Sequence, residues 1–445
     1  MLQVKSTNLN YLSKIVKMPE LRAHPSADRL SLVTVEGQVI ITGKDAVVGG
    51  LYIYFPLECK INKDFLSYIN GYSDPELNQD KTKKGFFSVK CRVKATRLRS
   101  ILSEGYLHPV FEFNDWLKTQ KIKYQVTEAD LNKEFDSIGD LLFVEKYVPG
   151  NQKVAGAPNG PKSRVKRESR LVDNQFRLSP DYRHLKREIN TIHPEDWIEI
   201  TSKWHGANGV IAKVGVKRKL SMTDKIAKFF GAKIIESEYG LVVSSRRVIK
   251  NEFADQKTND FYDANVWELV GKKYQECLQN GISCYGEVVG FTPTGGAIQK
   301  CKKGAYDYGC AENQCDFYVF RITYTSVDGQ VYEFSLQQVL DYCNKFGLKH
   351  VPVYYIGRAK DLYPELDVAV GSDWHENFLN KLIENYLEKD CIYCQGRLPD
   401  EGVVLSKRIG GFVGLKLKSQ KFLLAESEQL DSEEISVEDA ENSLT

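Results

Sequence analysis

The chain has 445 residues with a hydrophobic content of 42% and an aromatic content of 11%, enough to fill the cores of about two or three domains. Its apolar runs are no longer than β-strands, and its first residues lack the apolar segment of an export signal. These features exclude a membrane-spanning protein and predict an intracellular, cytoplasmic one. The ten cysteines follow no disulfide pattern, in agreement with a reducing compartment.

The net charge of +2 conceals an uneven distribution. Residues 426–445 hold eight acidic residues and no Lys or Arg, so subtracting −8 from +2 leaves +10 for the rest of the chain. A body with this charge can bind a polyanion, although a solvated surface accounts for the charge equally well. Because they contain few large apolar residues, residues 425–445 are predicted to form an acidic, disordered tail.

The first part of the chain, residues 1–135, predicts a small β domain. Short strand-like runs are separated by glycine-containing turns, a pattern typical of a barrel or a sandwich. These runs are 31–35, 39–42, 50–56 and 86–95. The stretch His24–Leu30 resembles the entry of the OB-type domains of tRNA-binding modules.

Basic residues alternate along the last of these runs. If 86–95 is a strand, Lys90, Arg92 and Lys94 share one face of it, close to the rings of Phe86 and Phe87. Such a face predicts a nucleic-acid-binding groove that follows phosphates and stacks bases. A solvated sheet face is the alternative.

Residues 136–195 are interpreted as a linker and the start of the next module. The part from 150 to 170 is rich in Gly, Pro, Asn and basic residues, which predicts an extended segment, and Leu178–Ile189 predicts a helix. From 196 the pattern is mixed α and β. Strands are expected at 196–202, 209–215, 240–247, 283–290, 316–324, 330–334, 351–355, 401–406 and 412–418. Helices are expected at 222–230, 260–279, 335–346 and 373–388.

A lysine stands at the mouth of a tight turn between two of these strands. Gly206 and Gly209 give the turn its backbone freedom, and Lys203 precedes it. An unperturbed lysine titrates near ~10.4, so a nucleophilic Lys203 needs nearby cations or a metal to lower its pKa. Taken alone, Lys203 is better explained as a surface lysine in a hairpin, and only partners further along the chain can favour a nucleophile.

Four later strands supply partners for Lys203. Glu287 lies between two glycines, Phe317 opens an aromatic strand, and Glu401 opens another strand. In 414–418, alternation places Lys416 and Lys418 on one face. Together these residues predict a nucleotide pocket, in which lysines neutralise phosphates, carboxylates bind ribose or the water around a divalent cation, and a ring faces the purine.

The order of these motifs carries a resemblance to a known class of enzymes. The motifs are Lys203–Gly206, Ser244–Arg246, Tyr285–Gly290, Phe317–Phe320, Glu401–Val404 and Leu415–Lys418. They resemble the six motifs of the covalent nucleotidyltransferases, which comprise DNA ligases, RNA ligases and mRNA capping enzymes. A β domain ahead of the motifs and a short acidic tail behind them are similar to the RNA ligases with an N-terminal OB domain, typified by the Deinococcus nick-sealing enzyme.

The resemblance implies an α+β fold and a reaction. The fold is an adenylation domain of antiparallel sheets flanked by helices at 196–424, preceded by a small OB-like β-barrel. The reaction is ATP-dependent RNA ligation, in which a lysyl-AMP intermediate adenylylates an RNA 5′-phosphate and a 3′-hydroxyl then displaces AMP. The implied partners are RNA ends or a nicked duplex, with no membrane, and the implied state is a monomer.

The resemblance also implies a role for each motif residue. Lys203 attacks the α-phosphorus of ATP, and Lys416 and Lys418 bind the α-phosphate. The other roles are phosphate contact for Arg246, ribose or metal-bound water for Glu287, adenine stacking for Phe317 or else Phe320, and orientation of hydrated Mg²⁺ or Mn²⁺ for Glu401.

One motif position departs from the family pattern. Many members have Asp two residues after the nucleophile, where it helps to hold metal-bound water, and this chain has His205. His205 is therefore a candidate for the metal site, for orienting the turn or for contacting phosphate. Cys391 and Cys394 form half of a zinc-site pattern, for which the sequence shows no second Cys-x-x-Cys.

Two other functions remain open at the level of the sequence. One is a covalent nucleotidyltransferase of another kind, either a DNA ligase or a GTP-using capping enzyme. The other is a catalytically inactive homologue that binds nucleic acid. The intact set of Lys203, Glu287, Glu401, Lys416 and Lys418 favours an active enzyme.

Overall fold

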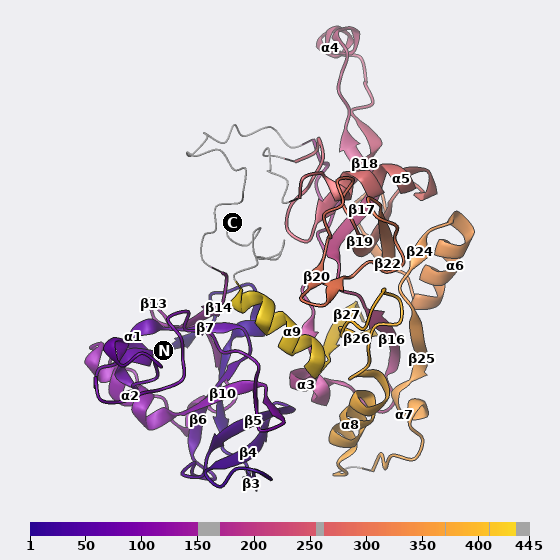
Figure 1. Cartoon of the computed structure of the whole chain (residues 1–445). Helices are drawn as coiled ribbons and strands as arrows, with labels where there is room; N and C mark the ends of the chain where they lie inside the picture. The colour runs from indigo at the N-terminus through magenta and orange to yellow at the C-terminus, as the bar shows by residue number, and fades with distance from the viewer. Residues whose placement is uncertain (150–169, 255–261, 370, 409, 433–445) are drawn as a thin grey trace.

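The computed structural model of the chain describes residues 1–149, 170–254, 262–369, 371–408 and 410–432. An N-terminal β domain lies beside a larger domain built on two sheets, and helix α9 (Gln420–Asp431) lies between them (Figure 1). In this described part, no helix is long and apolar enough to cross a membrane. Most of the predicted extended segment and the last part of the predicted tail lie outside the described residues.

The N-terminal domain is mostly antiparallel β structure. One sheet has the order β10-β6-β2-β11, and a second has the order β3-β4-β5. Their apolar side chains alternate toward a shared core that contains Val33, Ile40 and Tyr54. The predicted small β-barrel is confirmed, including three of its four predicted strands. The strands are β2 (Ser13–Lys17), β3 (Arg22–Ala23), β4 (Leu30–Val35), β5 (Gln38–Gly43), β6 (Leu51–Pro56), β10 (Gly105–Pro109) and β11 (Glu134–Phe135).

The prediction of a fourth strand at 86–95 is wrong. This segment forms turns and an irregular path, with an isolated bridge between Lys60 and Arg92. Cys91 has a φ of +56°, which interrupts the extended conformation that alternation requires. The basic residues of this segment therefore do not share a strand face.

The N-terminal domain extends beyond the predicted boundary at 135. Strand β14 (Val144–Lys146) pairs with β7 (Cys59–Ile61), so residues after 135 complete this domain. Phe143 lies in its aromatic core, against Phe65 of α1 (Lys63–Tyr68). Helix α2 (Val110–Thr119) packs on the same core.

The larger domain has two mainly antiparallel sheets. The first has the order β18-β17-β19-β22-β23, with β24 beside β22, and the second has the order β15-β27-β26-β16-β25. Nearly all the strands predicted between 196 and 418 are present. The first sheet comprises β17 (Ala207–Lys217), β18 (Ser237–Ser245), β19 (Ile282–Gly290), β22 (Cys315–Thr325), β23 (Val331–Glu333) and β24 (Lys349–His350). The second comprises β15 (Arg183–His184), β16 (Trp197–Lys203), β25 (Val353–Arg358), β26 (Gly402–Lys407) and β27 (Val413–Lys418).

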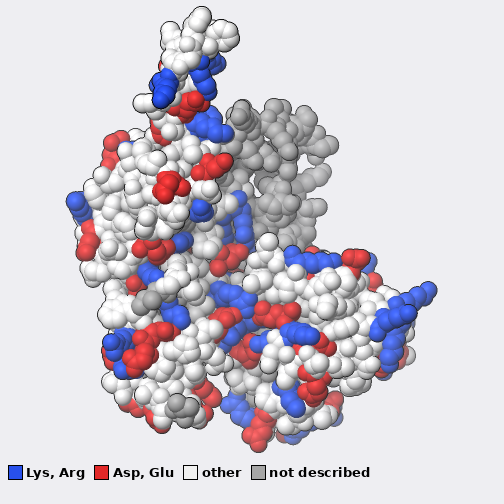
Figure 2. Space-filling view, turned by 180° about the vertical axis from the view of Figure 1, so that it is seen from behind, with Lys and Arg blue, Asp and Glu red and all other residues white. Residues whose placement is uncertain are grey.

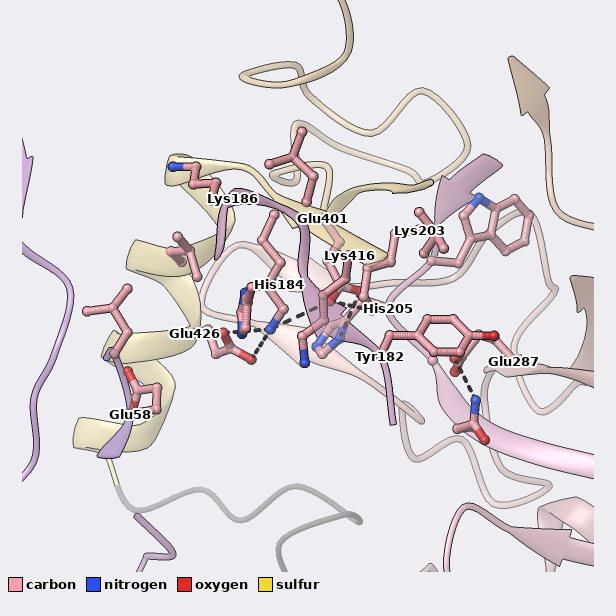
Figure 3. A pocket seen from close by; sticks show the side chains of 18 of the residues that line it. Glu58, Tyr182, His184, Lys186, Lys203, His205, Glu287, Glu401, Lys416 and Glu426 are labelled. Carbon is pink, nitrogen blue, oxygen red and sulfur yellow. Dashed lines mark hydrogen bonds and ion pairs between the residues drawn. The ribbon is translucent and has the colours of Figure 1, made fainter. Parts of the chain in front are cut away.

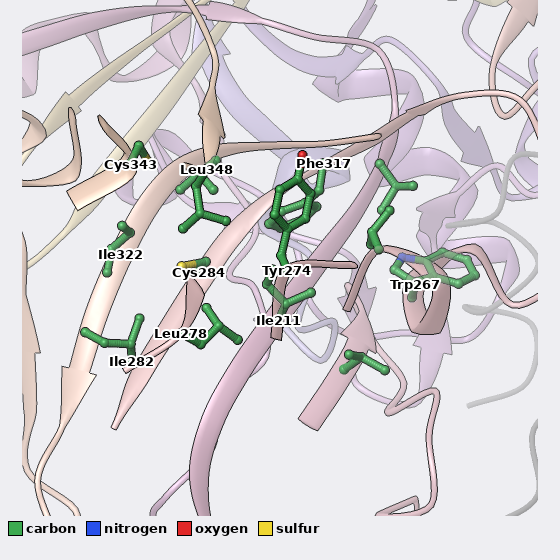
Figure 4. Packing of buried hydrophobic residues seen from close by; sticks show 14 of the residues in the cluster. Ile211, Trp267, Tyr274, Leu278, Ile282, Cys284, Phe317, Ile322, Cys343 and Leu348 are labelled. Atoms are coloured by element: carbon green, nitrogen blue, oxygen red, sulfur yellow. The ribbon is translucent and has the colours of Figure 1, made fainter. Parts of the chain in front are cut away.

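Helices cover the outer faces of both sheets. Helices α5 (Val266–Tyr274) and α6 (Leu336–Phe346) pack against the first sheet, where Trp267, Tyr274 and Phe317 share one buried cluster (Figure 4). Helix α8 (Trp374–Tyr386) covers the second sheet. Between β17 and β18 the chain extends outward and carries α4 (Met222–Phe229) at its tip (Figure 1). The predicted helix 178–189 is reduced to α3 (Leu185–Glu188) and a following turn.

The turn after Lys203 carries the chain from one sheet to the other. Strand β16 ends at Lys203 in the second sheet, and β17 begins at Ala207 in the first. The two strands do not pair with each other. Gly206 has no room for a side chain, because an added Cβ would lie 2.7 Å from the carbonyl oxygen of Val288. Lys203 therefore lies where the two sheets meet, and not in a surface hairpin.

Candidate active site

A pocket opens where the two sheets, the N-terminal domain and α9 meet. Its walls include Lys203, His205, Glu287, Glu401, Lys416 and Lys418, together with Tyr182 and His184 from the segment before β16 (Figure 3). The N-terminal domain contributes Glu58 and Glu104, and α9 contributes Glu426. Figure 2 shows basic and acidic side chains close together where the N-terminal domain meets the larger domain.

Strand register places the two central lysines on either side of one carboxylate. In the second sheet Lys203 pairs with Gly402, and Gly402 pairs with Lys418. Glu401 precedes Gly402, and its Oε1 lies 2.7 Å from Nζ of Lys203 and 3.7 Å from Nζ of Lys418. Gly402 is required here, because its φ is +131° and a Cβ would lie 2.1 Å from the carbonyl oxygen of Leu417.

Lys418 is held as a cation by two carboxylates. Its Nζ lies 2.8 Å from Oε1 and 2.9 Å from Oε2 of Glu426 on α9. Burial by itself lowers the pKa of Lys418, but Glu426 and Glu401 outweigh it, so this pKa lies above its ordinary value. Burial likewise raises the pKa of Glu426, yet Lys418 keeps that pKa below its ordinary value.

Glu426 was missed in the sequence because it was assigned to a disordered tail. The tail prediction is wrong for residues 425–431, which form the second half of α9. Two sequence signals mark this helix. Ser419 is a capping residue whose side chain accepts from the N–H of Phe422, and Phe422 and Leu430 lie at helical spacing and are buried.

His205 lies in an apolar corner of the pocket. Its ring packs edge-on against Tyr306 and Phe422, and the backbone N–H of His205 donates to the hydroxyl of Tyr308 at 2.7 Å. Burial lowers the pKa of His205, although Glu401, whose Oε2 is 3.8 Å from Nδ1, acts in the opposite direction. His205 is therefore a neutral side chain at neutral pH.

The carboxylates fit a hydrated divalent cation better than a tightly ligated one. Oε2 of Glu401 is buried and has no hydrogen-bond partner within the described ranges, so an acceptor is available to metal-bound water. Glu287 accepts from Nδ2 of Asn208 at 3.3 Å, because these residues are paired in adjacent strands. Among the described residues, no three His, Cys, Asp or Glu side chains gather as a direct metal cage.

The predicted stacking residue, Phe317, does not line the pocket. It is fully buried on the helix-covered face of the first sheet, where it pairs with Val288 (Figure 4). Phe320, the alternative in the prediction, does line the pocket and lies beside an irregularity in the β19–β22 pairing. Tyr182 lies edge-on to Phe320 with ring centroids 6.1 Å apart, and it was missed because no strand pattern marks it.

Arg246, a predicted phosphate contact, also lines the pocket. It follows β18, and its guanidinium is 3.5 Å from Oδ1 of Asp181. Oδ2 of the same Asp181 contacts Arg247. The two arginines therefore share a carboxylate at the rim of the pocket.

The three predicted nucleic-acid-binding residues of the N-terminal domain contact the end of α9. Arg92 has a buried side chain that lies 2.7 Å from Glu58 and 2.5 Å from Asp431. Nζ of Lys94 lies 3.2 Å from Asp431, and Nζ of Lys90 donates to the carbonyl of Asp431 at 3.0 Å. Tertiary contacts therefore bring these cations together at the C-terminal end of α9.

Cys391 and Cys394 lie close together. Their sulfur atoms are 3.5 Å apart, and within the described ranges no third metal-ligating side chain joins them in a cluster. Both are buried beside Trp204 and Tyr308. In the described structure this pair is part of an apolar core.

Comparisons with known proteins agree with this architecture. Residues 196–413 match the family model of RNA ligases. No match was found among curated proteins.

Solved structures of an RNA ligase from Naegleria gruberi resemble almost the whole chain. A mutant with ATP and Mn has 17% sequence identity and a TM-score of 0.55, covering 93% of this chain and 98% of that chain. The enzyme with PPi has 16% identity and a TM-score of 0.54, with the same coverages. Another mutant with ATP and Mn has 14% identity and a TM-score of 0.53, covering 95% of this chain and 99% of that chain. The chain therefore has the nucleotidyltransferase fold of an RNA ligase, with a β-barrel domain before it.

Proposed function

We propose that the protein is an ATP-dependent RNA ligase that joins a 3′-hydroxyl end to a 5′-phosphate end through a lysyl-AMP intermediate. The main observation behind this proposal is that Lys203, Glu401 and Lys418 lie close together on three adjacent strands. The match of residues 196–413 to the RNA ligase family supports this reaction class. The related ligase structures with ATP and Mn support ATP as substrate and Mn²⁺ or Mg²⁺ as the metal.

The first step transfers AMP to the enzyme. Nζ of Lys203 loses a proton, for which Glu401 at 2.7 Å is a nearby acceptor, and forms a bond to the α-phosphorus of ATP. The bond from that phosphorus to the β-phosphate oxygen breaks, and pyrophosphate leaves. Lys416 and Lys418 are positioned to neutralise the charge that develops on the α-phosphate.

Two further steps complete the reaction. An oxygen of the RNA 5′-phosphate attacks the lysyl-AMP phosphorus, and the bond from phosphorus to Nζ breaks. The RNA 3′-hydroxyl then attacks the 5′-phosphate phosphorus, loses its proton and displaces AMP. Arg246 at the pocket rim is suited to hold the incoming phosphate.

The remaining pocket residues position the nucleotide. Phe320 and Tyr182 offer rings for the adenine, and Glu287 offers an acceptor for ribose hydroxyls. Glu401, through its buried Oε2, and Glu287 would hold a divalent cation by way of its water. When bound, the cation supplies charge neutralisation at the phosphates.

We also propose that the chain belongs with the nick-sealing type of RNA ligase and acts in RNA repair. The N-terminal β-barrel before the adenylation domain supports this subfamily. So does the closeness of that barrel to the pocket, to which it contributes Glu58 and Glu104.

The direct test is incubation with α-labelled ATP and Mg²⁺ or Mn²⁺, followed by denaturing electrophoresis. We expect a labelled band for wild type and for Lys213→Ala, whose lysine is on β17 outside the pocket, and no band for Lys203→Ala. A band with GTP alone would contradict ATP ligation and favour capping. No band with either nucleotide would favour an inactive nucleic-acid-binding homologue.

A further inference from the structure

Helix α9 joins the two domains across the pocket. It begins directly after Lys418, at its cap Ser419, and ends at Asp431 beside the N-terminal domain (Figure 1). Near its end, Oγ of Ser427 donates to Glu58 at 2.8 Å and accepts from the N–H of Ala95 at 3.2 Å. The helix therefore spans the opening between the catalytic lysines and the basic residues of the β-barrel.

Every carboxylate of α9 is paired with a cation from another part of the chain. Glu426 pairs with Lys418 at 2.8 Å, and Glu428 pairs with Lys302 at 3.1 Å. Asp431 pairs with both Arg92 and Lys94. The helix thus presents a row of negative charges to separate groups of positive charges.

Two of these contacts define a path out of the pocket, because Glu426 lines the pocket and Asp431 is joined to the lining residue Glu58 through Arg92. Glu426 points from α9 into the pocket (Figure 3), and Asp431 lies five residues further along the helix, a rise of about 7.5 Å. The cations at these two positions would serve successive phosphates of a strand that leaves the active site toward the β-barrel. Asp431 itself lies outside the pocket lining, as do Glu428 and Lys302 of the third contact, but Arg92, which pairs with Asp431, also contacts the lining residue Glu58 at 2.7 Å.

The contacts at the outer end of the path are of the kind that another anion can replace. The side chains of Lys94 and Asp431 are 48% and 45% exposed, and such exposed ion pairs stabilise a protein weakly. Arg92 keeps a second partner, Glu58, when Asp431 leaves. Loss of Asp431 from this position therefore costs the fold little.

We propose that α9 lies in the binding site of the RNA strand, and that RNA phosphates take the positions of its carboxylates. The cations now paired with Glu426 and Asp431 form that site: Lys418 at the inner end, and Lys90, Arg92 and Lys94 at the outer end. RNA binding then requires α9 to withdraw its carboxylates, which couples strand binding to opening of the nucleotide pocket. This inference rests on the proposed function only in naming RNA as the polyanion.

The test measures the affinity of a 5′-phosphorylated nicked RNA duplex for the full-length protein without ATP. The variants are Asp431→Asn, and Glu428→Gln as a matched control that removes one negative charge from the same helix outside the path. We expect Asp431→Asn to bind RNA about two- to fivefold more tightly, because an exposed competing pair has been removed, and Glu428→Gln to bind as wild type does. Melting temperatures establish that both variants are folded.

A double-mutant cycle gives a second readout that a purely structural role of Asp431 would not change. If Asp431 and RNA compete for Lys94, the gain from Asp431→Asn is smaller in a Lys94→Ala background. Equal tightening by Asp431→Asn and Glu428→Gln would indicate a general charge effect and overturn the proposal. Unchanged or weaker RNA binding by Asp431→Asn would also overturn it.

The same protein preparations separate this inference from the proposed reaction. Formation of the lysyl-AMP adduct is measured in parallel and does not enter the affinity. An adduct with no effect of Asp431→Asn on RNA binding would remove the inference and leave the ligase. Tighter RNA binding by Asp431→Asn without any adduct would support the inference on α9 and contradict the proposed ligase reaction.

Discussion

Two sets of basic residues with the same alternating spacing behave differently in this protein. Lys416 and Lys418 lie on β27, which pairs with β26 along its length, so alternation sends both side chains to the pocket face. Lys90, Arg92 and Lys94 lie on an irregular segment with one isolated bridge. Lys90 contacts the backbone carbonyl of Asp431 at the end of α9, whereas Arg92 and Lys94 contact its carboxylate. Alternating charge therefore predicts a shared face only where neighbouring strands hold the backbone extended.

The largest effect on stability is expected within the strand-built region. Phe317→Ala removes a fully buried ring and should lower the free energy of unfolding by about 3–5 kcal/mol. Phe320→Ala opens a pocket wall and should leave stability nearly unchanged while raising KM for ATP. Urea unfolding and adenylylation kinetics of both variants check this. A KM effect confined to Phe317→Ala would restore the original stacking prediction.

The next effect tests the carboxylate between the two lysines. Glu401→Gln keeps the shape of the side chain but removes the charge that lies 2.7 Å from Nζ of Lys203. We expect the rate of lysyl-AMP formation to fall by about 10²–10³-fold, as for loss of one preorganised electrostatic group. Glu195→Gln, an exposed surface change, is the control. A normal rate for Glu401→Gln would show that the strand-built site does not depend on this residue.

A third prediction addresses the irregular region. The side chain of Arg92 is buried between Glu58 and Asp431, so Arg92→Ala should destabilise the protein by about 2–4 kcal/mol, because it leaves a buried carboxylate unpaired. Lys94→Ala, half-exposed, should change stability by about 0.5 kcal/mol or less. Urea denaturation measures both. Equal effects would mean that the two residues occupy equivalent positions, as a shared strand face requires.

The smallest effect is a pH dependence that originates in the strand-built region. Burial, with Lys416 and Lys418 nearby, holds the pKa of His184 well below its ordinary value. As the pH falls through about 6.5, His184 takes up a proton in the unfolded chain but not in the folded protein. The free energy of unfolding therefore decreases toward acid pH. Between pH 7.5 and 5.5, we expect wild type to lose about 1 kcal/mol more than His184→Gln. The same loss in both would exclude His184 as the cause.

Part of the candidate active site was predictable because it depends on local chain geometry. Lys203 at a strand end, Glu401 before a glycine and two lysines at alternate positions each follow from strand periodicity and turn residues. The six ordered motifs indicated the fold class, and the sheets and helices confirm it. The sequence favoured Phe317 over Phe320 for stacking, whereas Phe320 lines the pocket, because a shift in the β19–β22 register changes which side chains face the pocket.

The sequence by itself determined most of the strands and the order of the motifs, since these depend on contacts between near neighbours in the chain. Only the tertiary structure decided which charges meet across long separations. Arg92 forms an ion pair with Asp431, and Lys186 forms one with Glu104. Each pair joins the two domains, and the amino-acid composition does not indicate which cation pairs with which carboxylate. The tail around Glu426 is helical for the same reason: its few apolar residues would not order it in isolation, but Phe422 and Leu430 are buried and Lys418 pairs with Glu426.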